Sequence, residues 1–220
     1  MNSIVITKSY DAPAFCEKEA LRYAGCKKTD ENMTELLNSC KAEVWEKLSY
    51  KVCYRELRVK TDGEVCDFGV FSAESHDLSK NLDGCQKVIL FSATVGIELD
   101  RLIAKYGRLS PSKALMFQAI GAERVEALCD AFCEDIKREK NLGLKPRFSP
   151  GYGDLEFGVQ KDIFAVLDPS KRIGVTLNDS FLLSPSKSVT AFVGLTDCGE
   201  TVPQNKCSNC QKVDCMLREV

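Results

Sequence analysis

Histidine is nearly absent from this sequence, which has only His76 among its 220 residues. A histidine-rich metal site is therefore excluded, and catalysis by histidine has a single candidate. The surrounding stretch SAESHDLSKNLDG is polar, so we expect His76 to be a solvated loop residue rather than a catalytic group.

Long apolar runs and an excess of one charge are also lacking. No run approaches the roughly 18 residues that a membrane-spanning helix needs. The 30 basic and 32 acidic residues give a net charge of −2, so there is no electrostatic reason to expect nucleic acid or an anionic membrane as a partner. The first residues, MNSIVITKSYDAPAF, contain no basic leader and no long apolar region. They do not resemble a signal peptide, and we expect a cytoplasmic protein.

Cysteine, in contrast, is abundant, with twelve residues. A disulfide scaffold is not expected in a chain of this length without an export signal. Most of the cysteines are scattered, several of them in apolar patterns where a thiol behaves as a small hydrophobic group. The last four crowd the end of the chain, at Cys198, Cys207, Cys210 and Cys215.

These four thiols are enough to hold a tetrahedral zinc ion or an iron–sulfur cluster. The Cys207-x-x-Cys210 core is the informative part, because two thiolates at that spacing can chelate one metal ion. The full spacing matches neither common zinc ribbons nor ferredoxins, so a redox dithiol and a tail without metal stay open as alternatives. We interpret residues 196–220 as a Cys-rich appendage to a main domain at 1–195.

Hydrophobic periodicity predicts groups of helices and strands rather than strict β-α-β alternation. Helical patterns cover 13–24, 29–48, 97–107, 110–141 and 158–168, and strand patterns cover 50–59, 64–71, 87–96 and two segments within 172–195. Gly121 inside the long helix is an expected point of close packing. This order favours an α+β fold with a mainly antiparallel, twisted sheet and flanking helices, whose first part, to about residue 60, is mainly helical.

The stretch RFSPGYGD, residues 147–154, combines a fixed cation, bare backbone and an aromatic ring. Arg147 can clamp a carboxylate with two parallel hydrogen bonds, which lysine cannot do. Gly151 allows a close backbone approach, and Tyr152 supplies a flat surface for a planar ligand. Taken alone, these residues fit an ordinary tight turn as well as a cradle for an acidic, planar ligand.

The same stretch, followed by GVQKDIFAVLDPSKRIGVTL and NDSFLLSPSKSVTAFVG, resembles the activation (reactivation) domain of cobalamin-dependent methionine synthase. The family pattern is Arg-x-x-x-Gly-Tyr, a helix, a Leu-x-x-Ser-Phe strand, and then Pro and Ser-Val-Ser. The helix LMFQAIGAERVEALCDAFCEDI also resembles the family's helix before the loop, and the match covers roughly residues 88–195. The N-terminal ALRYAGCKK resembles stand-alone forms of the domain.

The resemblance implies binding of S-adenosylmethionine, whose methyl group restores a cobalamin that has slipped to the inactive cob(II) state. The implied partners are a cobalamin-binding methionine synthase, or another corrinoid protein, and a flavodoxin-like or ferredoxin-like electron donor. The implied ligand-binding residues are Arg147, Gly151, Tyr152 and Glu126. The paired tyrosine that follows the Ser-Val-Ser strand in the fused domain has no counterpart in LTDCGETVPQ, so a partner protein is expected to complete the pocket.

Three functions therefore compete. The protein is a component of methionine synthase activity that reactivates the enzyme in trans, an iron–sulfur redox activator of another corrinoid methyltransferase, or a non-catalytic module that binds S-adenosylmethionine or the cobalamin domain. Binding of S-adenosylmethionine is the premise of reactivation in trans, and it also tests the binding module. The redox activator depends instead on a cluster in the Cys-rich tail.

Overall fold

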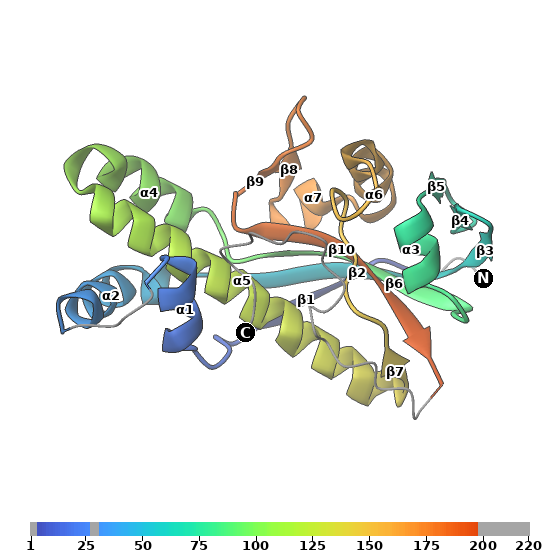
Figure 1. Ribbon diagram of the computed structural model, residues 1–220, viewed down its shortest axis with the longest axis horizontal. Coiled ribbons are helices and arrows are strands. Elements are labelled where there is room, and N and C mark those ends of the chain that lie inside the picture. Colours follow the sequence, from blue (N-terminus) through green and yellow to red (C-terminus); the bar gives the residue numbers. More distant parts are fainter. Residues whose placement is uncertain (1–3, 27–30, 198–220) are drawn as a thin grey trace.

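The computed structural model describes residues 4–26 and 31–197. Its centre is a five-stranded antiparallel sheet with the order β1-β2-β6-β10-β7 (Figure 1). These strands are β1 (Ile6–Tyr10), β2 (Tyr50–Arg58), β6 (Lys87–Thr94), β10 (Ser188–Thr196) and β7 (Gly143–Leu144). The sheet and its flanking helices confirm the α+β fold class.

Helices cover both faces of this sheet. One face packs against α1 (Glu17–Tyr23), α2 (Glu31–Val44), α4 (Glu98–Leu109) and α5 (Pro111–Lys140), and the other against α3 (His76–Asn81), α6 (Gln160–Leu167) and α7 (Pro169–Ile173). In Figure 1, α5 runs along the sheet as its longest helix, with α1, α2 and α4 near its first half. The short helices η1 (Trp45–Lys47) and η2 (Phe157–Val159) lie in connections.

Small strands complete the second face. A three-stranded sheet consists of β3 (Lys60–Asp62), β4 (Val65–Asp67) and β5 (Ser72–Glu74), and a hairpin consists of β8 (Thr176–Leu177) and β9 (Leu183–Ser184). The two strands predicted within 172–195 are three in the structure, because the first is the hairpin of the two-residue strands β8 and β9 and the second is the long β10.

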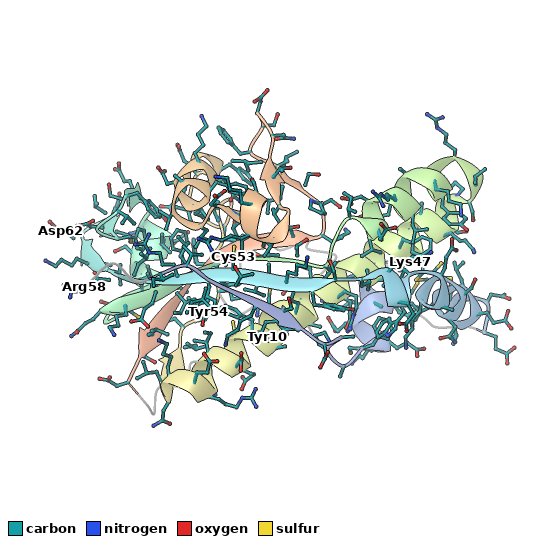
Figure 2. All side chains as sticks on the ribbon, turned by 180° about the vertical axis from the view of Figure 1, so that it is seen from behind. Tyr10, Lys47, Cys53, Tyr54, Arg58 and Asp62 are labelled. Carbon is teal, nitrogen blue, oxygen red and sulfur yellow. The ribbon has the colours of Figure 1, made fainter. Side chains whose placement is uncertain are left out.

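Two hydrophobic cores result, one on each face of the sheet. In β6, Ile89 and Phe91 belong to the α5 core, whereas Val88 and Leu90 belong to the opposite core. A strand covered on both faces has no polar side to show, which explains the continuous apolar run predicted as a buried strand. Figure 2 shows the same alternation in β2, where Cys53 and Tyr54 lie on opposite faces.

The long helix α5 is confirmed together with its start, because Ser110 is the N-cap and Pro111 the first helical residue. Gly121 marks close packing as expected. A Cβ atom there would lie 2.8 Å from Cγ of Lys187, whose side chain crosses the helix at this point.

A buried ion pair on α5 holds the chain before α1. Arg124 is 0% exposed and Glu123 is 3% exposed, and Nε of Arg124 lies 2.5 Å from Oε2 of Glu123. The guanidinium also donates to the carbonyls of Pro13 (2.7 Å) and Ala14 (2.8 Å), and the amide of Cys16 donates to Glu123 (2.9 Å). We call residues 13–16 the strap, because these bonds fasten it across α5.

The strap explains why the first helix is shorter than predicted. The pattern at 13–24 placed Pro13 at the helix start, but α1 begins at Glu17. The carbonyls of Pro13 and Ala14 accept hydrogen bonds from Arg124 instead of from helix amides. The edge strand β1 was not predicted at all, so the first 60 residues contain two strands of the main sheet, β1 and β2, besides their helices.

His76 is also placed differently. It is exposed, as expected of a solvated residue, but it is the first residue of α3 and not part of a loop. Ser75 is the N-cap, and its hydroxyl accepts a hydrogen bond from the amide of Leu78 at 3.0 Å. The polar composition of this stretch predicts a loop, but the stretch contains a short helix with an N-cap.

We expect Arg124→Met to destabilise the protein by about 3–5 kcal/mol, because it leaves the buried Glu123 carboxylate without its cation and removes the donors to the strap. Urea unfolding at pH 7 measures this change. The control is Arg101→Ala, which breaks the exposed pair with Glu98 and should change the free energy of unfolding by less than about 1 kcal/mol. Equal effects of the two substitutions would contradict the role given to the buried pair.

Candidate functional site

The RFSPGYGD loop follows β7 and crosses the sheet edge beside β10. Phe148 exchanges two backbone hydrogen bonds with Phe192 of β10, at 2.9 and 2.8 Å, so the loop starts from a fixed register. The side chain of Arg147 is only 10% exposed and points back toward α5 rather than out to water.

Arg147 is held by two carboxylates of α5. Its Nη2 lies 2.7 Å from Oε2 of Glu126, and its Nη1 lies 2.5 Å from Oδ1 of Asp130. Burial by itself disfavours the charged guanidinium, but the carboxylates of Asp130 and Glu126 outweigh this effect and raise the pKa of Arg147. The structure thus brings together two of the predicted site residues, Arg147 and Glu126, and adds Asp130.

Gly151 and Tyr152 take a different position. Gly151 has a φ of +90°, and a Cβ atom there would lie 2.5 Å from Cζ of Phe157, so this glycine is required by the packing of the loop itself. Tyr152 is 56% exposed, and its ring has an edge contact with Phe148 at a centroid distance of 6.2 Å. Tyr152 is thus largely exposed, whereas Arg147 is turned inward.

The far end of the loop is anchored to α3 through Asp154. Its carboxylate accepts hydrogen bonds from the hydroxyl of Ser75 and from the amides of His76 (2.8 Å) and Asp77 (3.2 Å). The bond from Ser75 and those from the two amides lower the pKa of Asp154, so the carboxylate stays ionised at neutral pH. The loop is therefore fixed at both ends, to α5 by Arg147 and to α3 by Asp154.

A pocket of about 440 Å³ lies between the strap, α1 and α5, and we call it the strap pocket. It is lined by Pro13, Ala14, Cys16, Glu19, Arg22, Tyr23, Glu123, Glu126, Ala127 and Asp130. Glu126 and Asp130 thus line the pocket and bind Arg147 at the same time. This shared pair connects the predicted loop to a cavity.

Negative charge dominates the wall of the strap pocket. Four of its lining residues are carboxylates and one, Arg22, is a guanidinium. Arg22 binds Glu19 through two hydrogen bonds of 3.0 and 2.7 Å. Glu123 is paired with Arg124, whereas Glu126 and Asp130 share the single guanidinium of Arg147. The carboxylate charge left in excess by this sharing favours a ligand that carries positive charge.

The sequence interpretation missed the strap, Asp130 and the Glu123–Arg124 pair. One signal was present, because Arg124 falls four residues after Ile120 and four before Leu128, both of which are buried on α5. A charged residue in the middle of an apolar stripe must find a buried partner. The position of the strap itself has no local signal, since its contacts are made more than 100 residues away along the chain.

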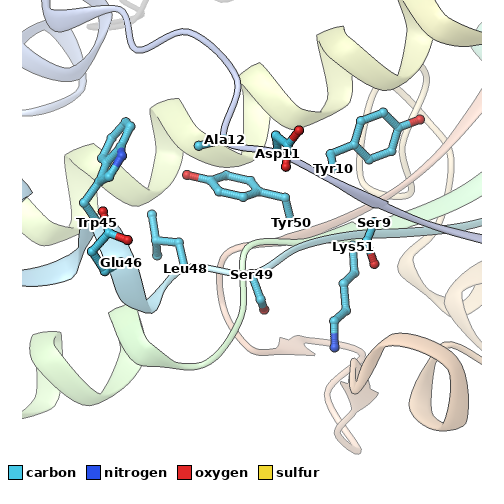
Figure 3. A pocket seen from close by; sticks show the side chains of 10 residues that line it. All are labelled: Ser9, Tyr10, Asp11, Ala12, Trp45, Glu46, Leu48, Ser49, Tyr50 and Lys51. Atoms are coloured by element: carbon cyan, nitrogen blue, oxygen red, sulfur yellow. The ribbon is translucent and has the colours of Figure 1, made fainter.

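A second pocket, of about 480 Å³, lies where the chain leaves β1 and enters β2 (Figure 3). Trp45, Tyr50 and Tyr10 line it together with Asp11, Glu46 and Lys51. None of the predicted site residues reaches it. We therefore take the strap pocket as the candidate site.

Five of the eight described cysteines are buried thiols with a raised pKa. Burial raises the pKa of Cys53 to about 12 and that of Cys40 and Cys66 to about 11, and it also raises the pKa of Cys129 and Cys133 beside Arg147. These thiols stay protonated at neutral pH. Within residues 4–26 and 31–197, no group of three or more His, Cys, Asp or Glu residues is placed to hold a metal ion.

The predicted metal ligands Cys198, Cys207, Cys210 and Cys215 lie outside the described residues. In the part of the chain that is described, no helix has the length and apolar character needed to cross a membrane.

Comparison with solved structures identifies the fold of the chain. No protein-family model matches this chain, and no curated protein matches it either. Among solved structures, it is similar to a crystal structure of the MetH reactivation domain bound to AdoHcy, with a TM-score of 0.66 over 91% of this chain and 81% of that chain. The sequence identity is 14%, so the likeness is one of fold. The chain thus has the fold of the MetH reactivation domain, which confirms the architecture that its motifs implied.

Proposed function

We propose that this protein binds S-adenosylmethionine in the strap pocket and supports reductive remethylation of cobalamin on a separate methionine synthase. The observation that carries this proposal is the position of Arg147. In a chain with the reactivation-domain fold, this motif residue turns inward and binds Glu126 and Asp130, two carboxylates that line the pocket.

The residues of the strap pocket fit this ligand. Its volume of about 440 Å³ is within the range of roughly 300–1,000 Å³ for small-molecule sites. S-adenosylmethionine carries two cationic groups, a sulfonium and an ammonium, and the carboxylates of Glu126 and Asp130 suit both of them. Its carboxylate needs a cation. Arg147 does not line the pocket itself, but its guanidinium contacts the lining residues Glu126 and Asp130 and has more N–H donors than these two ion pairs use.

Each residue then has a role in holding the ligand. Arg147 orients the ligand carboxylate, and Glu126 and Asp130 attract the ammonium. The strap closes one side of the pocket, where the buried Glu123–Arg124 pair fixes it. Positioning of this kind is the part of a cofactor reaction that a protein contributes.

Reactivation transfers the sulfonium methyl group to the cobalt of the partner's cobalamin after one-electron reduction, and it leaves S-adenosylhomocysteine. The chemistry belongs to the two small molecules and to a flavodoxin-like or ferredoxin-like donor. The protein is accordingly a component of a methyltransferase system rather than a complete enzyme. The exposed ring of Tyr152, on the same loop as Arg147, lies where a macromolecular partner can reach it.

We expect Arg147→Ala to weaken binding of S-adenosylmethionine by more than tenfold, or about 1.4 kcal/mol, because the ligand carboxylate loses its cation. Arg147→Lys should also weaken binding, since an ammonium cannot form the two parallel bonds. Isothermal calorimetry measures both, with Arg101→Ala on α4 as the control. If Arg147→Ala binds with unchanged affinity, Arg147 does not bind the ligand carboxylate.

We expect S-adenosylmethionine to protect Cys16 from alkylation. Cys16 lines the strap pocket and is exposed, so bound ligand should block access to its thiol. Mass spectrometry of iodoacetamide-treated peptides measures the rate at Cys16. Cys26, which is partly exposed and does not line the pocket, is the internal control. Equal rates with and without a ligand that calorimetry shows to be bound would place the site elsewhere.

We expect the protein to restore turnover to a cob(II)-inactivated methionine synthase that lacks a reactivation domain. Recovery should require S-adenosylmethionine and a reduced electron donor together, and Arg147→Ala should slow it. Methionine formation over time measures the effect. If the protein binds S-adenosylmethionine but gives no recovery, it is a binding module rather than a reactivator.

A further inference from the structure

The aromatic surface for the adenine of S-adenosylmethionine is not where the loop motif places it. The motif assigns this surface to Tyr152, but Tyr152 does not line the strap pocket and its ring is exposed beside Phe148. Of the ten residues that line the pocket, the aromatic one is Tyr23, at the end of α1.

Tyr23 is part of a fixed stack. The guanidinium of Arg22 lies over its ring, 4.6 Å from the centroid. Arg22 is in turn held by Glu19, whose Oε2 accepts hydrogen bonds from Nε (3.0 Å) and Nη2 (2.7 Å). All three residues line the pocket, so two flat groups are presented there with little freedom to move.

We propose that this Arg22–Tyr23 stack is the binding surface for the adenine, a proposal that rests on the function given above. Flat bases stack well on tyrosine rings and on arginine guanidinium planes. The remaining lining residues are carboxylates or the small side chains of Pro13, Ala14, Cys16 and Ala127, and none of these offers a comparable flat surface.

The charge of the stack selects the adenine over the sulfonium. A cation can bind an aromatic face, but the guanidinium of Arg22 already occupies the region over Tyr23. A second positive charge would be repelled there, whereas the uncharged base is not. The sulfonium and ammonium therefore belong beside Glu126 and Asp130, with the base at the α1 end of the same pocket.

Four single substitutions test this assignment, with affinity for S-adenosylmethionine measured by calorimetry. We expect Tyr23→Ala and Tyr23→Leu to weaken binding about tenfold or more, because base stacking on an aromatic side chain is lost. Tyr23→Phe should bind within about twofold of the unsubstituted protein, since the ring remains. Tyr152→Ala should also bind within about twofold, because Tyr152 lies outside the pocket.

The leucine and phenylalanine variants separate stacking from simple packing, because both keep an apolar side chain but only one keeps a ring. Thermal unfolding of each variant shows that the fold is retained. If Tyr23→Leu binds as well as Tyr23→Phe, or if Tyr152→Ala is the variant that loses affinity, the assignment is wrong although the pocket still binds the ligand. If the unsubstituted protein does not bind S-adenosylmethionine, the proposed function itself fails.

Discussion

The buried pair of Glu123 and Arg124 is the constraint on which the site depends. Either of these two adjacent charges in the middle of a 30-residue helix would be costly to bury without a partner. Their ion pair compensates the burial of both. The remaining donors and acceptors of the pair are used on the strap, through the carbonyls of Pro13 and Ala14 and the amide of Cys16. One wall of the strap pocket is thus attached by polar groups of the opposite wall, and the shape of the pocket depends on this buried pair.

The second fixed element is the loop with Arg147. Its backbone is paired to β10 at Phe148, and its two ends are bound to different helices, α5 and α3. Leu155, directly after the loop, is buried in the core between the sheet and α6. A loop with these four attachments has little conformational freedom left to lose, so the proposed ligand would bind at a lower cost in entropy than it would to a mobile loop.

Much of the architecture follows from local pattern. The apolar run of β6 and the Ser-Pro start of α5 predict a buried strand and a long helix, and both are present. Within the site, the proximity of Arg147 and Glu126 was implied only by the family resemblance. The two residues are 21 positions apart, so local pattern does not predict their contact. The strap and Tyr23 could not be predicted, because their places depend on α5, about 100 residues later in the chain, and local periodicity contains no information about such contacts.

The RFSPGYGD loop has one side turned toward the interior and another exposed to solvent. Arg147 faces inward to the pocket carboxylates, and Tyr152, five residues later, faces outward. The positive φ of Gly151, together with its close approach to Phe157, turns the chain between these two directions. A Cβ atom at that position would clash with the ring of Phe157. The glycine of the motif therefore lies where the loop changes from its inward side to its exposed side, the two sides to which the proposed function assigns the ligand and a partner.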